Sequence, residues 1–153
     1  MSPALGTSGS GPPRLDFEIR LPPGATLPAN AGAIRIELST ERNSMPGEIF
    51  PARTREEENR VVIAGSVELY YRSSWRLLAL DMPAGEPSRI FRISLPARPG
   101  HMREHGPWQR LDFVADSAGQ PQAAPTSGET FEIRYRVVYR DKELEEEAGG
   151  GGQ

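Results

Sequence analysis

The residues best suited to chemistry are the two histidines, His101 and His105, which lie four positions apart with Glu104 between them. On a helix this spacing would bring both imidazoles onto one face, as a pair of metal ligands requires. A Pro-Gly pair at 99–100 and a Gly-Pro pair at 106–107 disfavour a helix here, and no third ligand is evident. We therefore expect a surface loop that gains charge below about pH 6.5, with metal binding as the weaker alternative.

Aspartates could supply a second kind of site, because Asp81, Asp112 and Asp116 could meet at one end of a β domain as calcium ligands. They lack Asp-x-Asp spacing, so we expect ordinary carboxylates at strand ends. A serine triad could be drawn from Ser73, His105 and Asp81, but nothing like a nucleophile elbow surrounds the serine. There is no phosphate loop and no dinucleotide fingerprint. We expect no catalytic residue and no cofactor.

Four large aromatic residues are candidates for binding: Tyr70, Tyr71, Trp75 and Trp108. Adjacent Tyr70 and Tyr71 point to opposite faces of any strand that holds both, so one of them meets solvent. An exposed ring beside an arginine would form a platform for a partner or for a small ligand such as a carbohydrate. Packing in the core is the competing interpretation for each ring.

Arginines form the last candidate surface, since Arg134 and Arg136 share one face of a strand by parity and could meet an anionic partner. Glu132 lies on the same face, which favours a solvent face of salt bridges instead. The formal net charge of −3 argues against a general nucleic-acid binder, because such proteins need a dense positive face.

The remaining composition narrows the class of protein. The chain contains no cysteine, which excludes disulfides, thiolate nucleophiles and cysteine-bound metals. The first residues have no basic start followed by an apolar run, as a signal peptide would, and no window reaches the ~18 apolar residues of a membrane span. We expect a soluble, cytoplasmic protein, although an exported form with its signal removed would look the same.

The elements that must position these residues are strands, and residues 130–140 give the clearest one. Phe131, Ile133, Tyr135, Val137 and Tyr139 occupy every second position, and charged residues fill most positions between them. Because side chains alternate across a strand, this spacing predicts one face on a core and one face toward water.

Further strands are predicted at 15–21, 34–38, 48–50, 61–71, 75–82, 90–95 and 108–115, separated by turns rich in proline and glycine. Gly65 predicts a bulge, or a bend where a second backbone comes close. Two facing antiparallel sheets would bury both apolar faces, so we expect an all-β sandwich of about seven to eight strands, immunoglobulin-like or similar. The predicted domain covers 14–141, between disordered tails at 1–13 and 142–153, the second of which is acidic and glycine-rich.

Nothing in the residues identifies an activity, and the expected function is binding without catalysis. The partner would be another protein, or a second copy of the chain, meeting a sheet edge or the loops at 96–107 and 116–129. A module that binds a small ligand through the exposed aromatics is the alternative. A metal-dependent enzyme around the histidine loop is a weaker one.

Overall fold

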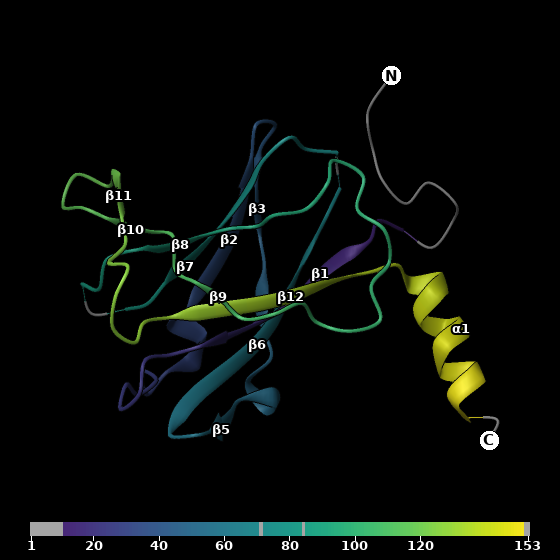
Figure 1. Cartoon of the computed structure of the whole chain (residues 1–153), viewed down its shortest axis with the longest axis horizontal. Helices are drawn as coiled ribbons and strands as arrows, with labels where there is room; N and C mark the ends of the chain where they lie inside the picture. Colours follow the sequence, from purple (N-terminus) through teal and green to yellow (C-terminus); the bar gives the residue numbers. More distant parts are fainter. Residues whose placement is uncertain (1–10, 71, 84, 152–153) are drawn as a thin grey trace.

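The computed structural model describes residues 11–70, 72–83 and 85–151. Within these residues, twelve strands form two antiparallel sheets of six strands each, which face one another as a sandwich (Figure 1). The all-β two-sheet fold expected from the sequence is therefore confirmed.

The first sheet has the order β4-β6-β1-β12-β9, and β5 pairs with β6 beside β4. Its strands are β1 (Arg14–Arg20), β4 (Glu48–Ile49), β5 (Arg55–Glu57), β6 (Arg60–Glu68), β9 (Gln109–Arg110) and β12 (Glu132–Val138). The second sheet has the order β11-β10-β8-β7-β2-β3. Its strands are β2 (Arg35–Thr40), β3 (Ser44–Pro46), β7 (Arg76–Asp81), β8 (Arg89–Arg92), β10 (Phe113–Ala115) and β11 (Pro121–Ala123).

Strand β12 behaves as its alternation predicts. Ile133 and Val137 are fully buried and Tyr135 nearly so, while the residues between them are only partly covered. The strand pairs with β1 along its whole length, with Ile133 opposite Ile19 and Tyr135 opposite Phe17. These side chains meet Leu78, Leu80 and Phe91 of the second sheet, which are also fully buried. One apolar core thus joins the two sheets.

Gly65 lies in β6 opposite Phe17 of β1 and Ile49 of β4. A Cβ atom built there would lie 2.2 Å from the Glu48 carbonyl oxygen and 2.6 Å from the Phe17 ring. The expected close approach of a second backbone is therefore present. No larger residue at position 65 would leave room for both β4 and the Phe17 ring.

The predicted strand at 108–115 is interrupted, because the chain changes sheets in its middle. The Leu111 amide donates to the Phe131 carbonyl beside β12, whereas the Asp112 amide donates to the Ile90 carbonyl of β8.

The long excursion at 116–129 also contains structure, since β11 pairs with β10 as a hairpin. Loop 96–107 covers the part of β12 that β9 leaves unpaired, through bonds from the Met102 and Gly106 amides to the Val137 and Tyr135 carbonyls.

The acidic segment differs from the expected disordered tail. It forms helix α1 (Arg140–Gly151), which continues directly from the end of β12 and stands at one end of the molecule (Figure 1). Two carboxylates attach the helix to the body, since Glu143 lies 2.6 Å from Arg14 and Glu146 pairs with His101. Asp141 and Glu143 also lie in the first turn, where negative charge stabilises a helix.

At the other end, residues 1–10 of the expected tail and residues 152–153 lie outside the described residues. Pro13, the last residue of the expected tail, is buried and its carbonyl accepts a hydrogen bond from the Leu69 amide at 2.8 Å. No helix within the described residues has the length and apolarity to cross a membrane.

Candidate functional site

The outer face of the second sheet is apolar over β7, β8 and β10. Leu78 and Leu80 turn into the core, so by parity Leu77 and Ala79 turn outward. Ala79 pairs with Ile90, and Ile90 pairs with Phe113, which extends the apolar strip across three strands. These outward side chains are only half-buried. A sheet face turned to water would normally alternate to polar residues, so this strip suits a contact with another molecule.

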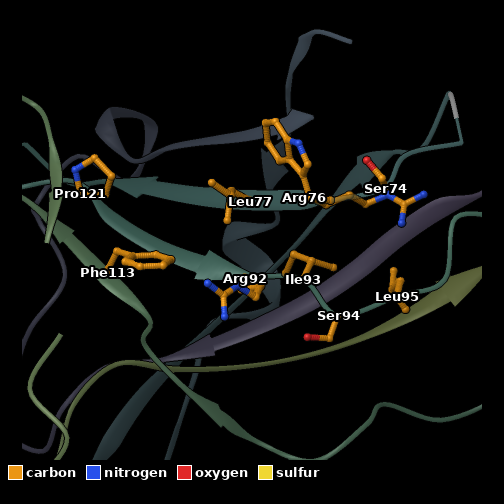
Figure 2. A pocket seen from close by; sticks show the side chains of 10 residues that line it. Ser74, Arg76, Leu77, Arg92, Ile93, Ser94, Leu95, Phe113 and Pro121 are labelled. Carbon is orange, nitrogen blue, oxygen red and sulfur yellow. The ribbon is translucent and has the colours of Figure 1, made fainter. Parts of the chain in front are cut away.

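A groove of about 460 Å³ lies on this face, between the start of β7 and the segment that follows β8. This volume falls in the range of ligand-sized clefts. Figure 2 shows Phe113 and Pro121 at one end of the groove and Ser74 and Leu95 at the other, with Leu77 and Arg92 between them. Trp75 also lines the groove. We call this site the Trp75 groove.

Trp75 is 47% exposed, which is unusual for so large an apolar ring. The residue before it is fixed by Glu41, whose Oε2 accepts hydrogen bonds from both the amide (2.6 Å) and the hydroxyl of Ser74. These bonds, led by that of the hydroxyl, lower the pKa of Glu41 to about 2. The backbone that presents Trp75 is therefore anchored to the turn after β2.

Among the described lining residues, the charge that the Trp75 groove exposes to solvent is the positive charge of Arg92. Arg92 is exposed, and its guanidinium lies 5.4 Å from the centre of the Phe113 ring. Within the described residues no carboxylate lies within salt-bridge distance of the Arg92 side chain, and none lines the groove. An anionic group entering beside Phe113 would meet an unpaired cation.

The second arginine of the groove, Arg76, has a positioning role. Its side chain is only 1% exposed, and it donates to the carbonyls of Pro96 and Ala97 at 3.1 and 3.2 Å. Burial lowers the pKa of this guanidinium, because the charged form loses its hydration. The two bonds hold the chain that follows Leu95, and so fix one end of the groove.

Trp108 lies elsewhere, on the outer face of the first sheet. The guanidinium carbons of Arg20 and Arg134 lie 4.4 and 4.5 Å from its ring centre. Two cations of its own chain thus contact the ring, a stabilising cation–π arrangement. The structure does not bring Trp108 together with Trp75.

Arg134 and Arg136 also lie on that first-sheet face, and both are engaged. Glu18 lies 2.6 Å from Arg134 and 2.7 Å from Arg55. Burial alone would raise the pKa of Glu18, but the hydrogen bonds from these arginines outweigh it and lower the pKa to about 2. Arg136 donates to the Arg103 carbonyl at 2.7 Å and approaches Asp16 at 3.7 Å. This is the salt-bridged face that Glu132 indicated.

The two histidines have different surroundings and do not form a shared site. His101 accepts a hydrogen bond from the Tyr139 amide through Nδ1 (3.0 Å), and its Nε2 pairs with Glu146. His105 is half-buried beside the first sheet, where burial first and then Arg134 and Arg136 lower its pKa. The described residues contain no group of three or more histidines and carboxylates that could hold a metal ion.

The other polar candidates have local roles. Asp116 accepts from the amides of Ala118 and Gln120 in the turn before β11, and Asp112 accepts from the Arg92 amide at 2.6 Å. Ser73 is buried just before β7, near Glu41 in the turn after β2, and Asp81 is the exposed last residue of β7, whereas His105 lies against the first sheet. These positions do not assemble a triad.

Of the paired tyrosines, Tyr70 is 40% exposed and lines a separate, small hollow, and Tyr71 lies outside the described residues. Most residues of the groove were missed by sequence reasoning, among them Leu77, Arg92 and Phe113. A signal was present, because residues 77–80 read Leu-Leu-Ala-Leu and are apolar on both faces of a strand. Nothing in the sequence shows, however, that Phe113 would stand beside β8.

Comparison of the chain with protein-family models, with curated proteins and with solved structures found no match. The Trp75 groove and the groups that line it are therefore the features of this chain that indicate a function.

Proposed function

We propose that this chain is a non-catalytic protein-interaction module whose Trp75 groove receives an apolar side chain of its partner, with a carboxylate beside it. The single observation that carries the proposal is an exposed tryptophan on an apolar groove that is lined by the exposed Arg92 and by no described carboxylate.

The chemistry of the groove supports a protein partner. Tryptophan and arginine are the residues that most often dominate protein interfaces, where a central pocket excludes water around an anchor. Leu77 and Phe113 supply the apolar floor, and Arg92 supplies an unpaired charge at its side. Burial of the partner's apolar surface would contribute a favourable free energy of about 25 cal/mol per Å². A charge-assisted hydrogen bond to Arg92 in a partly dry site would add to it.

Selection from a displayed peptide library tests this proposal. Peptides that bind the wild-type chain, and are removed by counter-selection on Trp75→Ala, should share an aliphatic or aromatic residue next to Asp or Glu. Binding of a selected peptide should weaken at least tenfold in Trp75→Ala, less in Trp75→Phe, and about threefold to tenfold in Arg92→Ala. Arg103→Ala serves as the matched control, because Arg103 is 79% exposed and lies outside the groove. Peptides that bind both the wild type and Trp75→Ala equally would contradict the proposal.

A second candidate is binding of a small ligand such as a carbohydrate, which the volume of about 460 Å³ and the exposed indole both favour. Sugars stack their apolar faces on such rings. In a Trp108→Phe background, the fluorescence of Trp75 should respond to neutral oligosaccharides. A response to acidic peptides but not to oligosaccharides would decide for the protein partner.

A further inference from the structure

We propose that the partner of the Trp75 groove is a second copy of this chain, whose helix α1 places Leu144 in the groove and Glu145 beside Arg92. This inference rests on the proposed function and identifies the occupant of the same site.

Leu144 has the properties that the groove requires. Its side chain is 52% exposed, and with Tyr70 and Trp75 it makes up the exposed large hydrophobic residues within the described part of the chain. It lies in the middle of α1 with glutamates on both sides. Glu143 is engaged with Arg14, whereas the side chain of Glu145 is 69% exposed and has only a 3.7 Å contact with Lys142. Leu144 and Glu145 are therefore an apolar group and a carboxylate, both presented to solvent.

The two surfaces are complementary in charge. Residues 140–147 contain five carboxylates against Arg140 and Lys142, so this segment alone carries the formal net charge of −3 of the whole chain. The groove offers the exposed guanidinium of Arg92 with no carboxylate among its lining residues. Opposite charges of this kind would attract the helix and set its direction in the groove.

Helix α1 cannot dock in the Trp75 groove of its own chain while its ion pairs with the body of that chain are kept. Glu143 pairs with Arg14 of the first sheet and Glu146 pairs with His101, while the groove opens on the outer face of the second sheet. Figure 1 shows α1 projecting from the end of β12, beyond the sandwich. Docking in a second copy leaves both pairs intact. If the exchange is mutual, two identical contacts close a two-fold dimer and bury both Leu144 side chains.

Sedimentation velocity of the full chain, from about 1 to about 500 µM, tests the inference across the range of weak and moderate interfaces. The wild type should shift from monomer to dimer, and Leu144→Ala should raise the dissociation constant at least tenfold while leaving the circular dichroism spectrum unchanged. Because Leu144 is exposed, this variant should fold normally. Association should also weaken as salt is added, since the contact joins opposite charges.

A charge exchange makes the test specific. Arg92→Glu and Glu145→Arg should each weaken the dimer at least fivefold, and the double variant should recover most of the loss. Glu129→Arg, at an exposed position outside both surfaces, should have no effect. A chain that stays monomeric at every concentration, or a dimer that is indifferent to Leu144→Ala, would overturn the inference. If the monomer still binds selected peptides through Trp75, the proposed function stands without it; if Trp75→Ala changes neither measurement, both fall.

Discussion

The hydroxyl of Tyr135 accepts a hydrogen bond from the backbone amide of Ser94 at 2.8 Å. Tyr135 belongs to β12 of the first sheet, and Ser94 lies just after β8 of the second sheet and lines the Trp75 groove. The side-chain amide of Gln109 donates to the same hydroxyl at 3.2 Å. One phenol thus couples the position of the groove backbone to the opposite sheet.

Replacing Tyr135 with Phe should loosen this coupling. The Ser94 amide would lose its acceptor, so the free energy of unfolding should fall by about 1–2 kcal/mol in urea denaturation. Peptide binding in the groove should weaken as well. Tyr139→Phe is the matched control, because its hydroxyl bonds the Pro99 carbonyl at 2.7 Å and does not touch the groove backbone. Equal effects of the two variants on binding would argue against the coupling.

Substitution of Gly65 by Ala should be costly. The new methyl group would overlap the Glu48 carbonyl and the Phe17 ring, so β4 or β1 must shift, and we expect a loss of at least about 2 kcal/mol. Gly100→Ala should change stability by less than about 0.5 kcal/mol, because nothing lies within 4 Å of a Cβ atom there. Thermal unfolding of both variants measures the difference. A mild effect at Gly65 would mean that β4 is free to move.

Acid should weaken the first sheet through Glu18. Its pKa is about 2 in the folded chain against an ordinary value of 4.5, so the protonated form is disfavoured by the fold. The resulting stability is present in full above about pH 4.5 and is lost as the pH falls toward 2. Glu18→Gln should cost about 2 kcal/mol at pH 7 and much less at pH 2.5, as urea midpoints at the two pH values would measure.

A suitable comparison for Glu18 is Glu57→Gln. Glu57 shares Arg55 but its side chain is 49% exposed, so this variant should cost under about 1 kcal/mol. If Glu18→Gln retained the full pH dependence of the wild type, the two arginines would not be the cause.

Arg76 allows a test of buried charge. Arg76→Met removes the charge and both hydrogen bonds to Pro96 and Ala97, whereas Arg76→Lys keeps a buried charge that cannot reach both carbonyls as a fork. Lysine should therefore be the worse replacement, with a loss of about 2–4 kcal/mol against a smaller loss for methionine. Urea denaturation ranks the three chains. Lysine matching the wild type would show that the fork geometry is dispensable.

Local patterns predicted the layers well and the groove poorly. The alternation from Phe131 to Tyr139 is a property of adjacent residues, so the core face of β12 could be read directly. The close backbone approach at Gly65 could be predicted for the same reason, since a glycine inside an apolar strand is a local signal of it. The groove depends on which strands become neighbours, and nothing near Phe113 in the sequence indicates that it will pair with Ile90 of β8.

The helix α1 was missed for a related reason. Residues 140–147 show no apolar face, and an isolated segment of that composition would not hold a helix in water. Its partners are Arg14, far earlier in the chain, and His101 in a loop. Contacts between residues so distant in sequence leave no mark on local spacing. The spacing of the histidine pair left a shared metal ligand open as the weaker alternative, and it could not show that the two rings have different partners in the fold.

The crossing at Leu111 and Asp112 has a consequence for how the molecule comes apart. Adjacent amides are committed to different layers, the first to the Phe131 carbonyl and the second to the Ile90 carbonyl. Neither sheet can separate from the other as an independent unit, because separation would break a hydrogen bond of the Leu111–Asp112 segment to one sheet or to the other. Slow amide exchange should therefore reach the same limiting rate in β12 and β8, the mark of a single cooperative opening rather than two.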